Sequence, residues 1–293
     1  SIRASNCVYR TFVYPMSRKL VVLGGTGFLG KRICEAAVEA NFKVTSLSRS
    51  GKAVSSEAWA QEVEWKSCDI FEPKSYASEL RNATDVVHSL GILLENENYK
   101  KQVNGTSLWP ASIPELPKMS TLFGKNPLEK GGHGSGATAK KSSATNFTYE
   151  MMNKYSATLL VDTYMKVNAG NARTFSYVSA DRGFPMIPRG YIDSKRAAEA
   201  HIMQYEDEIR PIILRPGFMF DERNTRADGR ARVRDLLQLL ICGNELLLGK
   251  KVGCVNELVR PLISTQQVAH ALMAVLNDAE FKGVLSLEDM ISV

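Results

Sequence analysis

A glycine-rich turn close to the start of the chain limits the possible fold more than any other feature. Residues 19–30 read KLVVLGGTGFLG, a short apolar run followed by closely spaced glycines and the start of a helical pattern. Glycines at 24, 27 and 30 permit, in that order, a tight turn, a close approach of the backbone to a pyrophosphate, and tight packing of helix on strand. The helix N-terminus adds unpaired amide groups for an anion. Because the pattern follows a strand and opens a helix, it predicts a dinucleotide site; a purely structural glycine turn is the other interpretation.

Strand and helix patterns alternate regularly on either side of one long irregular segment. Such alternation is typical of an α/β fold in which helices cover both faces of a parallel sheet. We therefore predict a doubly wound parallel-sheet Rossmann fold with a small C-terminal substrate lobe. The expected strands are 19–23, 43–47, 62–66, 85–90, 173–178 and 211–214, and the expected helices are 28–40, 73–81, 149–167 and 191–205.

Three segments differ from the Rossmann domain expected over 19–217. Residues 1–18 contain arginines, serines and aromatic side chains without an acid, as in a mitochondrial transit peptide; an ordinary tail is the alternative. Residues 95–146 show no sustained period and include the run GGHGSGATAKKSSAT, which predicts a flexible insertion. Residues 218–293 are too few for an independent domain, so we expect a small substrate-side lobe, with helices over 233–241 and 265–277 and some short strands.

The net charge of +6 resides in the first nineteen residues and in residues 100–148, and the remainder of the chain is slightly acidic. A nucleic-acid-binding protein would instead place basic side chains on one face of its folded elements, so we exclude that class. No apolar run reaches the roughly 18 residues of a transmembrane helix. The five cysteines and four histidines lack metal-ligand spacing, which predicts no metal site and reduced thiols, typical of cytosol or the mitochondrial matrix.

The residues after the second expected strand bear on the choice between NAD and NADP. An acid at this position would accept hydrogen bonds from the ribose hydroxyls, whereas an arginine suits a 2′-phosphate. The chain has Ser48 and Arg49 there and no nearby acid, which favours NADP(H) over NAD(H); a solvated arginine is the alternative. Asp69 after the third strand could accept from the adenine amino group or act as a helix cap. The full set of expected cofactor-binding residues is Gly24, Thr26, Gly27, Phe28, Leu29, Gly30, Ser48, Arg49, Asp69, Ile70, Leu90, Gly91, Lys195 and Pro216.

Tyr191 and Lys195 form a candidate catalytic pair. They are four residues apart in a helical pattern after the fifth expected strand, which places them one turn apart on the same face. A nearby ammonium lowers the pKa of a phenol, so Tyr191 could act as general acid or base on a carbonyl–alcohol pair. Lys195 could also hold the nicotinamide ribose. This spacing is common by chance, and the preceding glycine turn is what gives it weight.

With GGTGFLG at 24–30, HSLG at 88–91, YIDSK at 191–195 and LRPG at 214–217, the chain resembles the short-chain dehydrogenase/reductase superfamily in its extended, atypical branch. Within this branch it is similar to relatives of the 39-kDa NADPH-binding subunit of complex I, and to the fungal mitochondrial oxidoreductase-like group of the coenzyme Q biosynthetic complex. The resemblance implies that Asn153 is the helix asparagine of the family and assists a proton relay. It also implies a matrix-side protein in peripheral contact with the mitochondrial inner membrane. Its implied partners are the proteins of a ubiquinone-biosynthesis complex, and its candidate substrate is a prenylated quinone intermediate.

One position departs from the family pattern. The carbonyl-binding serine or threonine that the family has at the end of the fifth strand falls on Ala180, with Ser179 one residue earlier. Because a shift of one residue in a strand turns a side chain to the other face, either a bulge brings Ser179 round or the clamp is missing. Two functions therefore stay open. One is an oxidoreductase that uses Tyr191, Lys195, Ser179 and Asn153, and the other is a non-catalytic NADP-binding subunit of a mitochondrial inner-membrane complex.

Overall fold

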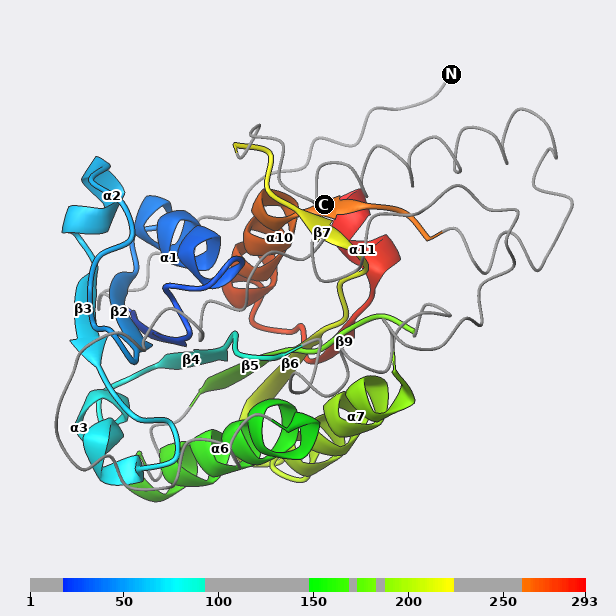
Figure 1. The fold of residues 1–293 in the computed structure, drawn as a ribbon, viewed down its shortest axis with the longest axis horizontal. Helices are drawn as coiled ribbons and strands as arrows, with labels where there is room; N and C mark the ends of the chain where they lie inside the picture. Colours follow the sequence, from blue (N-terminus) through cyan, green and yellow to red (C-terminus); the bar gives the residue numbers. More distant parts are fainter. Residues whose placement is uncertain (1–17, 93–147, 169–172, 183–187, 224–259) are drawn as a thin grey trace, which may run out of the picture.

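The sheet at the centre of the molecule has the strand order that a doubly wound fold requires. The computed structural model describes residues 18–92, 148–168, 173–182, 188–223 and 260–293. Seven parallel strands lie in the order β3-β2-β1-β4-β5-β6-β9, so the chain winds outward in both directions from β1 and β4 (Figure 1). This order confirms the predicted α/β Rossmann-like class. The strands are β1 Lys19–Leu23, β2 Lys43–Ser48, β3 Glu64–Ser67, β4 Asp85–His88, β5 Thr174–Val178, β6 Arg210–Leu214 and β9 Gly283–Leu285.

Helices cover both faces of this sheet (Figure 1). The helices α1 (Gly30–Glu39) and α10 (Thr265–Asn277) pack together over one face. The opposite face carries α6 (Ser156–Val167) and α7 (Arg189–Met203). Neighbouring residues of a strand point to opposite faces, so the sheet is buried between two apolar clusters.

Most expected elements are present, with shifts of a few residues at their ends. The helix expected over 73–81 is divided into a 3-10 turn, η1 (Pro73–Ser75), and α3 (Ala77–Leu80). The helix expected over 149–167 begins with a π-helical turn, η3 (Glu150–Tyr155), of the kind that often marks functional sites. Two short helices, α2 (Ala58–Gln61) and α11 (Leu287–Ser292), were not expected. The strands β7 (Met219–Phe220), β8 (Ile263–Ser264) and β9 agree with the short strands expected within 218–293.

From residue 260 onward, the chain lies within the Rossmann layers. We expected 218–293 to form a lobe beside the sheet, yet β9 pairs in parallel with β6 and α10 packs against α1. Ser264 begins α10 with a capping box, and at its other end Arg18 and Arg210 donate to carbonyl groups of the last turn. The substrate-side lobe stays a prediction for 218–259. Most of that segment, like the expected features at 1–17, 95–146 and 233–241, lies outside the described residues.

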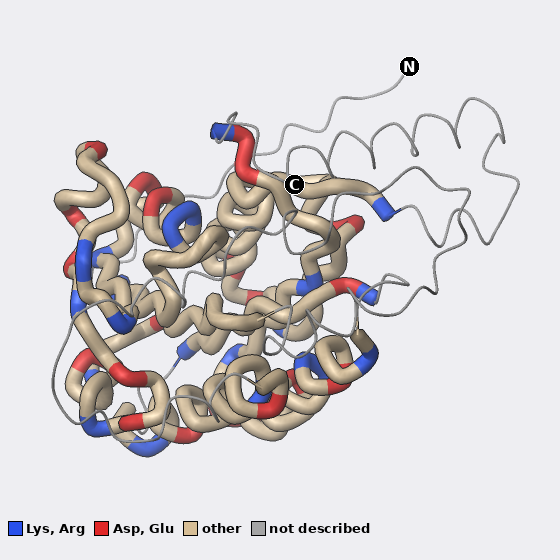
Figure 2. Tube along the Cα trace, viewed as in Figure 1, with Lys and Arg blue, Asp and Glu red and all other residues tan. Residues whose placement is uncertain are grey.

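Acidic and basic side chains are interspersed along the described helices and loops (Figure 2). None of the helices in the described part of the chain has the length and apolar character needed to cross a bilayer. Cys34 and Cys68 are buried thiols without a disulfide partner.

Candidate functional site

The glycine turn lies at the carboxyl end of β1, the edge where parallel sheets of this kind bind ligands. Gly24 has φ of +84°, and a Cβ there would come within 2.7 Å of the Leu90 side chain. At Gly30, the first residue of α1, a Cβ would lie 2.1 Å from the carbonyl oxygen of Gly24. The Gly27 amide donates to that same oxygen at 2.8 Å. Glycine is therefore required at 24 by its positive φ and its contact with the segment after β4, and at 30 by the packing of the helix start on the turn.

Gly27 has more open surroundings. Among the described atoms within 4 Å, a Cβ there would meet only the Gly24 oxygen, so the other side of the turn can admit a ligand. Thr26 and Phe28 on either side are partly exposed, whereas Leu29 is buried. The first turn of α1 contains no acid. An open backbone at a helix N-terminus fits the pyrophosphate of a dinucleotide.

Ser48 ends β2 and Arg49 follows it, at the same edge of the sheet. The Ser48 hydroxyl accepts from the Gly51 amide at 3.1 Å, and the Arg49 carbonyl accepts from the Ser67 hydroxyl at 2.8 Å. These bonds fix the loop backbone, while the Arg49 side chain is exposed and has no ion pair with another described residue. Its guanidinium is thus available to an anionic ligand.

Asp69 stabilises its own loop. Its Oδ1 accepts from the Phe71 amide at 3.0 Å, and its backbone exchanges two hydrogen bonds with the Ser75 hydroxyl. This is a turn-forming role, close to the cap that the sequence left as the alternative to adenine binding. The side chain is exposed and Oδ2 has no partner among the described residues, so the adenine role stays a prediction. Two other expected cofactor residues, Ile70 and Pro216, are buried behind this edge.

Lys195, Asn153 and Gly91 come together between β4, η3 and α7. Lys195 is almost fully buried, donates to the Val178 carbonyl oxygen at 2.8 Å and lies 3.4 Å from that of Leu90. A Cβ at position 91 would come within 3.0 Å of Lys195 Nζ and 3.2 Å of Asn153 Oδ1. Glycine at 91 therefore allows the lysine and the asparagine to reach the end of β4.

Asn153 links the segment after β4 to the N-terminal half of α7. Its Oδ1 accepts from the Ile92 amide at 2.9 Å, and its Nδ2 donates to the Ser194 hydroxyl at 3.2 Å. Ser194 in turn donates to the Tyr191 carbonyl oxygen at 2.8 Å. The asparagine is fully buried, so these bonds hold the region of Tyr191 in place.

The prediction that Lys195 lowers the pKa of Tyr191 is wrong for this structure. Tyr191 packs edge-on against Tyr149, with ring centroids 6.0 Å apart. Desolvation raises the pKa of Tyr191 to about 12, opposed by Arg196, while burial lowers the pKa of Lys195 to about 7, opposed by the carboxylate of Glu199. Each group therefore loses more from desolvation than it gains from nearby charges.

Ser179 belongs to a charged cluster at the carboxyl ends of β5 and β6. Its hydroxyl donates to the buried Glu199 carboxylate and accepts from Arg196 at 3.1 Å. Glu199 also pairs with Arg215, and Arg196 donates to the Ala180 carbonyl oxygen at 3.0 Å. The Ser179 hydroxyl thus already donates its proton to Glu199, and Ala180 has no hydroxyl. In this arrangement neither position supplies the family's carbonyl clamp.

Two residues beside the expected site, Glu199 and Tyr177, were missed from the sequence. Glu199 lies one helical turn after Lys195, and this spacing was the available signal. His88, part of the HSLG motif, is fully buried beside Ser156 at 2.9 Å and stays neutral, because burial and the nearby Lys195 charge lower its pKa to about 3. Tyr177 had no signal, since an aromatic residue in a strand is expected to be core.

We expect the buried Lys195 amine to make the protein more stable in alkaline solution. Its pKa is about 7 when folded and 10.5 when exposed, so between these values the unfolded chain binds more protons than the folded one. The free energy of unfolding should therefore rise with pH across that window. Chemical denaturation at several pH values, compared with the Lys195→Met variant, measures this. The lysine contributes no such term if both proteins show the same pH dependence.

A second charged cluster connects α1 to the segment after β7. The buried Asp221 carboxylate accepts from Arg32 NH2 at 3.1 Å on each oxygen, from Gln266 at 2.8 Å, and lies 2.9 Å from Lys31 Nζ. Burial alone would raise the pKa of Asp221, yet these partners lower it to about 2. Because Lys31 directly follows Gly30, the cluster holds the glycine turn, α10 and the segment after β7 as one unit.

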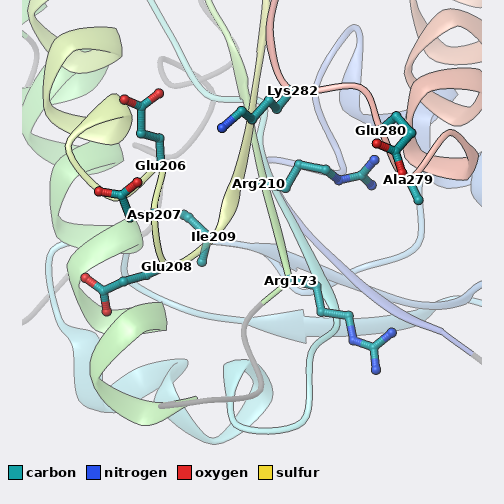
Figure 3. A pocket seen from close by; sticks show the side chains of 9 residues that line it. All are labelled: Arg173, Glu206, Asp207, Glu208, Ile209, Arg210, Ala279, Glu280 and Lys282. Carbon is teal, nitrogen blue, oxygen red and sulfur yellow. The ribbon is translucent and has the colours of Figure 1, made fainter.

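An open pocket of about 370 Å³ lies at the opposite edge of the sheet (Figure 3). Arg173 precedes β5, Arg210 begins β6 and Lys282 precedes β9, so the pocket is at the amino ends of the strands. None of the expected site residues lines it, and it is separate from the glycine turn. The other lining residues are Glu206, Asp207, Glu208, Ile209, Ala279 and Glu280.

The strand order, the glycine turn and the lysine–asparagine pair at one edge define a Rossmann-fold dinucleotide-binding protein. Residues 24–235 match the family described as NAD(P)H-binding, and the chain belongs to that family.

Comparison with known proteins agrees with this class. The chain is 46% identical over 290 residues to MIOREX complex component 2 of Saccharomyces cerevisiae, covering 94% of this chain and 99% of that protein. It is 24% identical over 280 residues to an uncharacterized chloroplastic protein of Arabidopsis thaliana, covering 94% and 76%. An oxidoreductase of the short-chain dehydrogenase/reductase family from Burkholderia thailandensis aligns with a TM-score of 0.56 at 15% identity, over 94% of each chain. The structure of ElxO with NADP bound aligns with a TM-score of 0.56 at 14% identity, over 95% of this chain and 100% of that one. The predicted resemblance is confirmed, and the two structures show the fold alone.

Proposed function

We propose that this chain is an NADP(H)-binding oxidoreductase of the short-chain dehydrogenase/reductase type that acts in, or regulates, ubiquinone biosynthesis in mitochondria. The packing of Lys195, Asn153 and Gly91 at the edge that carries the glycine turn is the observation that carries the proposal. The cofactor supplies hydride transfer when it is bound. Lys195 would hold the nicotinamide ribose, and Tyr191 would hold or deliver the proton at the substrate oxygen.

The location and partners form part of the same proposal. The composition of residues 1–18 favours import into the mitochondrial matrix, and the resemblance favours the matrix side of the inner membrane with peripheral contact. The Saccharomyces cerevisiae relative is named as a complex component, which favours protein partners, here those of a ubiquinone-biosynthesis complex. A leading segment at 1–18, a Rossmann domain that includes residues from 260 onward, and a substrate lobe within 218–259 that takes a prenylated quinone intermediate complete the proposal.

The second candidate function is a non-catalytic NADP-binding subunit of a mitochondrial inner-membrane complex. The observation that favours it is the clamp position, where the Ser179 proton is donated to Glu199 and Ala180 has no hydroxyl. Such a subunit would need the cofactor for stability and would not need Tyr191.

Tyr191→Phe separates the two functions, because it removes the proton donor and keeps the ring that packs on Tyr149. For the oxidoreductase we expect ubiquinone synthesis to fall about a hundredfold in cells that rely on this protein. Gly27→Asp, which puts a carboxylate where the pyrophosphate binds, should abolish function in either case. Full activity of Tyr191→Phe together with loss in Gly27→Asp would establish the subunit.

Arg49→Glu tests the choice of cofactor. Loss of a charge-assisted hydrogen bond should raise the Kd for NADPH by roughly 10- to 100-fold and leave NADH binding nearly unchanged. Fluorescence titration of the purified full chain with each nucleotide measures both constants. Lys43→Glu makes the same charge change at the other end of β2 and should alter neither. Equal weakening of NADPH and NADH by Arg49→Glu contradicts the NADP preference.

A further inference from the structure

Lys195 has an unusual environment for a buried cation. Its Nζ donates to main-chain carbonyl oxygens, and no carboxylate in the described parts of the chain lies within ion-pair distance of it. The ring of Tyr177 lies under this ammonium, with the nitrogen 4.8 Å from the ring centroid. A cation at this distance from an aromatic face is attracted by the ring's negative potential, and more strongly where water is excluded.

Tyr177 also contacts the second member of the site. Its hydroxyl donates to the Asn153 carbonyl oxygen at 2.6 Å, within the π-helical turn η3. One fully buried side chain thus touches both Lys195 and Asn153, one through its face and the other through its hydroxyl.

Packing alone does not account for a tyrosine at this position. Phe175, two residues earlier on the same face of β5, is equally buried and fills its part of the core without a polar atom. Burial of a phenol has a cost that an apolar residue avoids, and desolvation raises the pKa of Tyr177 well above its usual value. The hydroxyl and the ring face therefore have specific partners, which a plain core position does not require.

We propose that Tyr177 is a positioning residue for Lys195 and Asn153, holding the lysine ammonium by its ring face and the π-helical turn by its hydroxyl. The proposal deepens the proposed function, since it concerns how the chain prepares Lys195 for the nicotinamide ribose. Through Tyr177, β5 supports Lys195 and Asn153. The strand thus contributes to the site although it lacks the family's carbonyl-binding serine at its end.

The other titratable groups around Lys195 can also act on its pKa, so an experiment on the Tyr177 ring must account for their charges. Glu199 of α7 attracts the ammonium and is itself held by Arg196. His88 of β4 packs against the Tyr177 ring at a centroid distance of 5.4 Å and is neutral. Tyr191 of α7 is also neutral near pH 7. These groups keep their charge when the Tyr177 ring is altered. A change in the pKa of Lys195 can therefore be assigned to the ring.

The test measures the pKa of Lys195 in the cofactor-free full chain by NMR titration with carbon-13-labelled lysine, the signal being assigned with Lys195→Met. Tyr177→Phe keeps the ring and should leave this pKa nearly unchanged. Tyr177→Leu removes the ring and should lower it by roughly 0.5 to 1.5, because the charged form loses its aromatic partner. Phe175→Leu removes a ring from the same face of the same strand and should not change it.

Fluorinated phenylalanines at position 177 keep the test decisive if Tyr177→Leu fails to fold. Added fluorines weaken the negative face of the ring at nearly constant shape, so the pKa of Lys195 should fall stepwise with their number. An unchanged pKa across this series overturns the proposal, as does an equal change in Phe175→Leu. If the shifts occur and the wild-type chain binds neither NADPH nor NADH, the cofactor role fails while the positioning role stands.

Discussion

Replacing Gly30 by alanine is expected to abolish nucleotide binding and to lower the free energy of unfolding by about 3 kcal/mol. The added Cβ would lie 2.1 Å from the Gly24 carbonyl oxygen and 2.9 Å from the Gly25 Cα, both main-chain atoms that have no rotamer to move away. The start of α1 would have to separate from the turn, and the amides that face a pyrophosphate would lose their arrangement. Denaturant unfolding and titration with NADPH measure the two effects.

Gly190→Ala is the matched control for this change. Gly190 lies in the first turn of α7, is exposed, and would place a Cβ at 3.4 Å from the Tyr149 side chain, an ordinary contact. Alanine in a helix is favoured over glycine, so this variant should gain about 0.5 to 1 kcal/mol. Similar loss of stability in both variants would show that the close packing of Gly30 does not exist.

Asp221→Asn is expected to cost about 3 kcal/mol of stability, because it removes the buried carboxylate that Lys31 and Arg32 share and leaves Arg32 with Glu35 as its remaining partner. An amide can still accept a hydrogen bond from Gln266 and cannot neutralise the cations. The wild-type contribution should also be lost in acid as the pH falls from 3.8, the ordinary pKa of the carboxyl group, toward about 2. Urea unfolding of both proteins at neutral and acid pH measures the difference.

Glu57→Gln makes the same chemical change in an exposed ion pair. Glu57 lies 3.6 Å from Arg223, and both side chains are about half exposed, so we expect a loss below about 1 kcal/mol. If Asp221→Asn costs no more than this control, the cluster on α1 does not hold the segment after β7.

The glycine turn could be predicted because its information is local. The strand, the turn and the helix start lie within twelve consecutive residues, and the structure gives Gly24 and Gly30 the packing that this pattern requires. The parallel pairing of β1 to β6 follows from the alternation of strands and helices, since crossovers between parallel strands wind in one sense. The two-residue strands carry too few side chains to form a pattern.

The charge state of the site could not be predicted in the same way. The spacing of Tyr191 and Lys195 correctly places them one turn apart, yet the proton affinity of each depends on its burial. Lys195 is buried against β5 and Tyr191 against a cluster that includes Tyr149. These neighbours are distant in sequence, and desolvation is a property of the assembled site. The role of Asp221 could not be predicted for the same reason, because its partner Arg32 is 189 residues away in the sequence. Ser179 is the clearest example of a role that the sequence could not predict. Its hydroxyl proton is donated to Glu199, which is 20 residues away in the sequence.

The contact between Arg18 and the last turn of α10 has a consequence for the order of folding. Arg18 bonds to Asp85 at the amino end of β4 and to the carbonyl oxygen of Leu276, which is 258 residues later in the chain. During synthesis β1, β2 and β4 can pair early, whereas α10 and β9 cannot join them until residues 265–285 have left the ribosome. Such distant pairing slows folding and leaves apolar surface uncovered meanwhile. The part of this face that α10 covers therefore stays exposed beside α1 until residues 265–277 have been made.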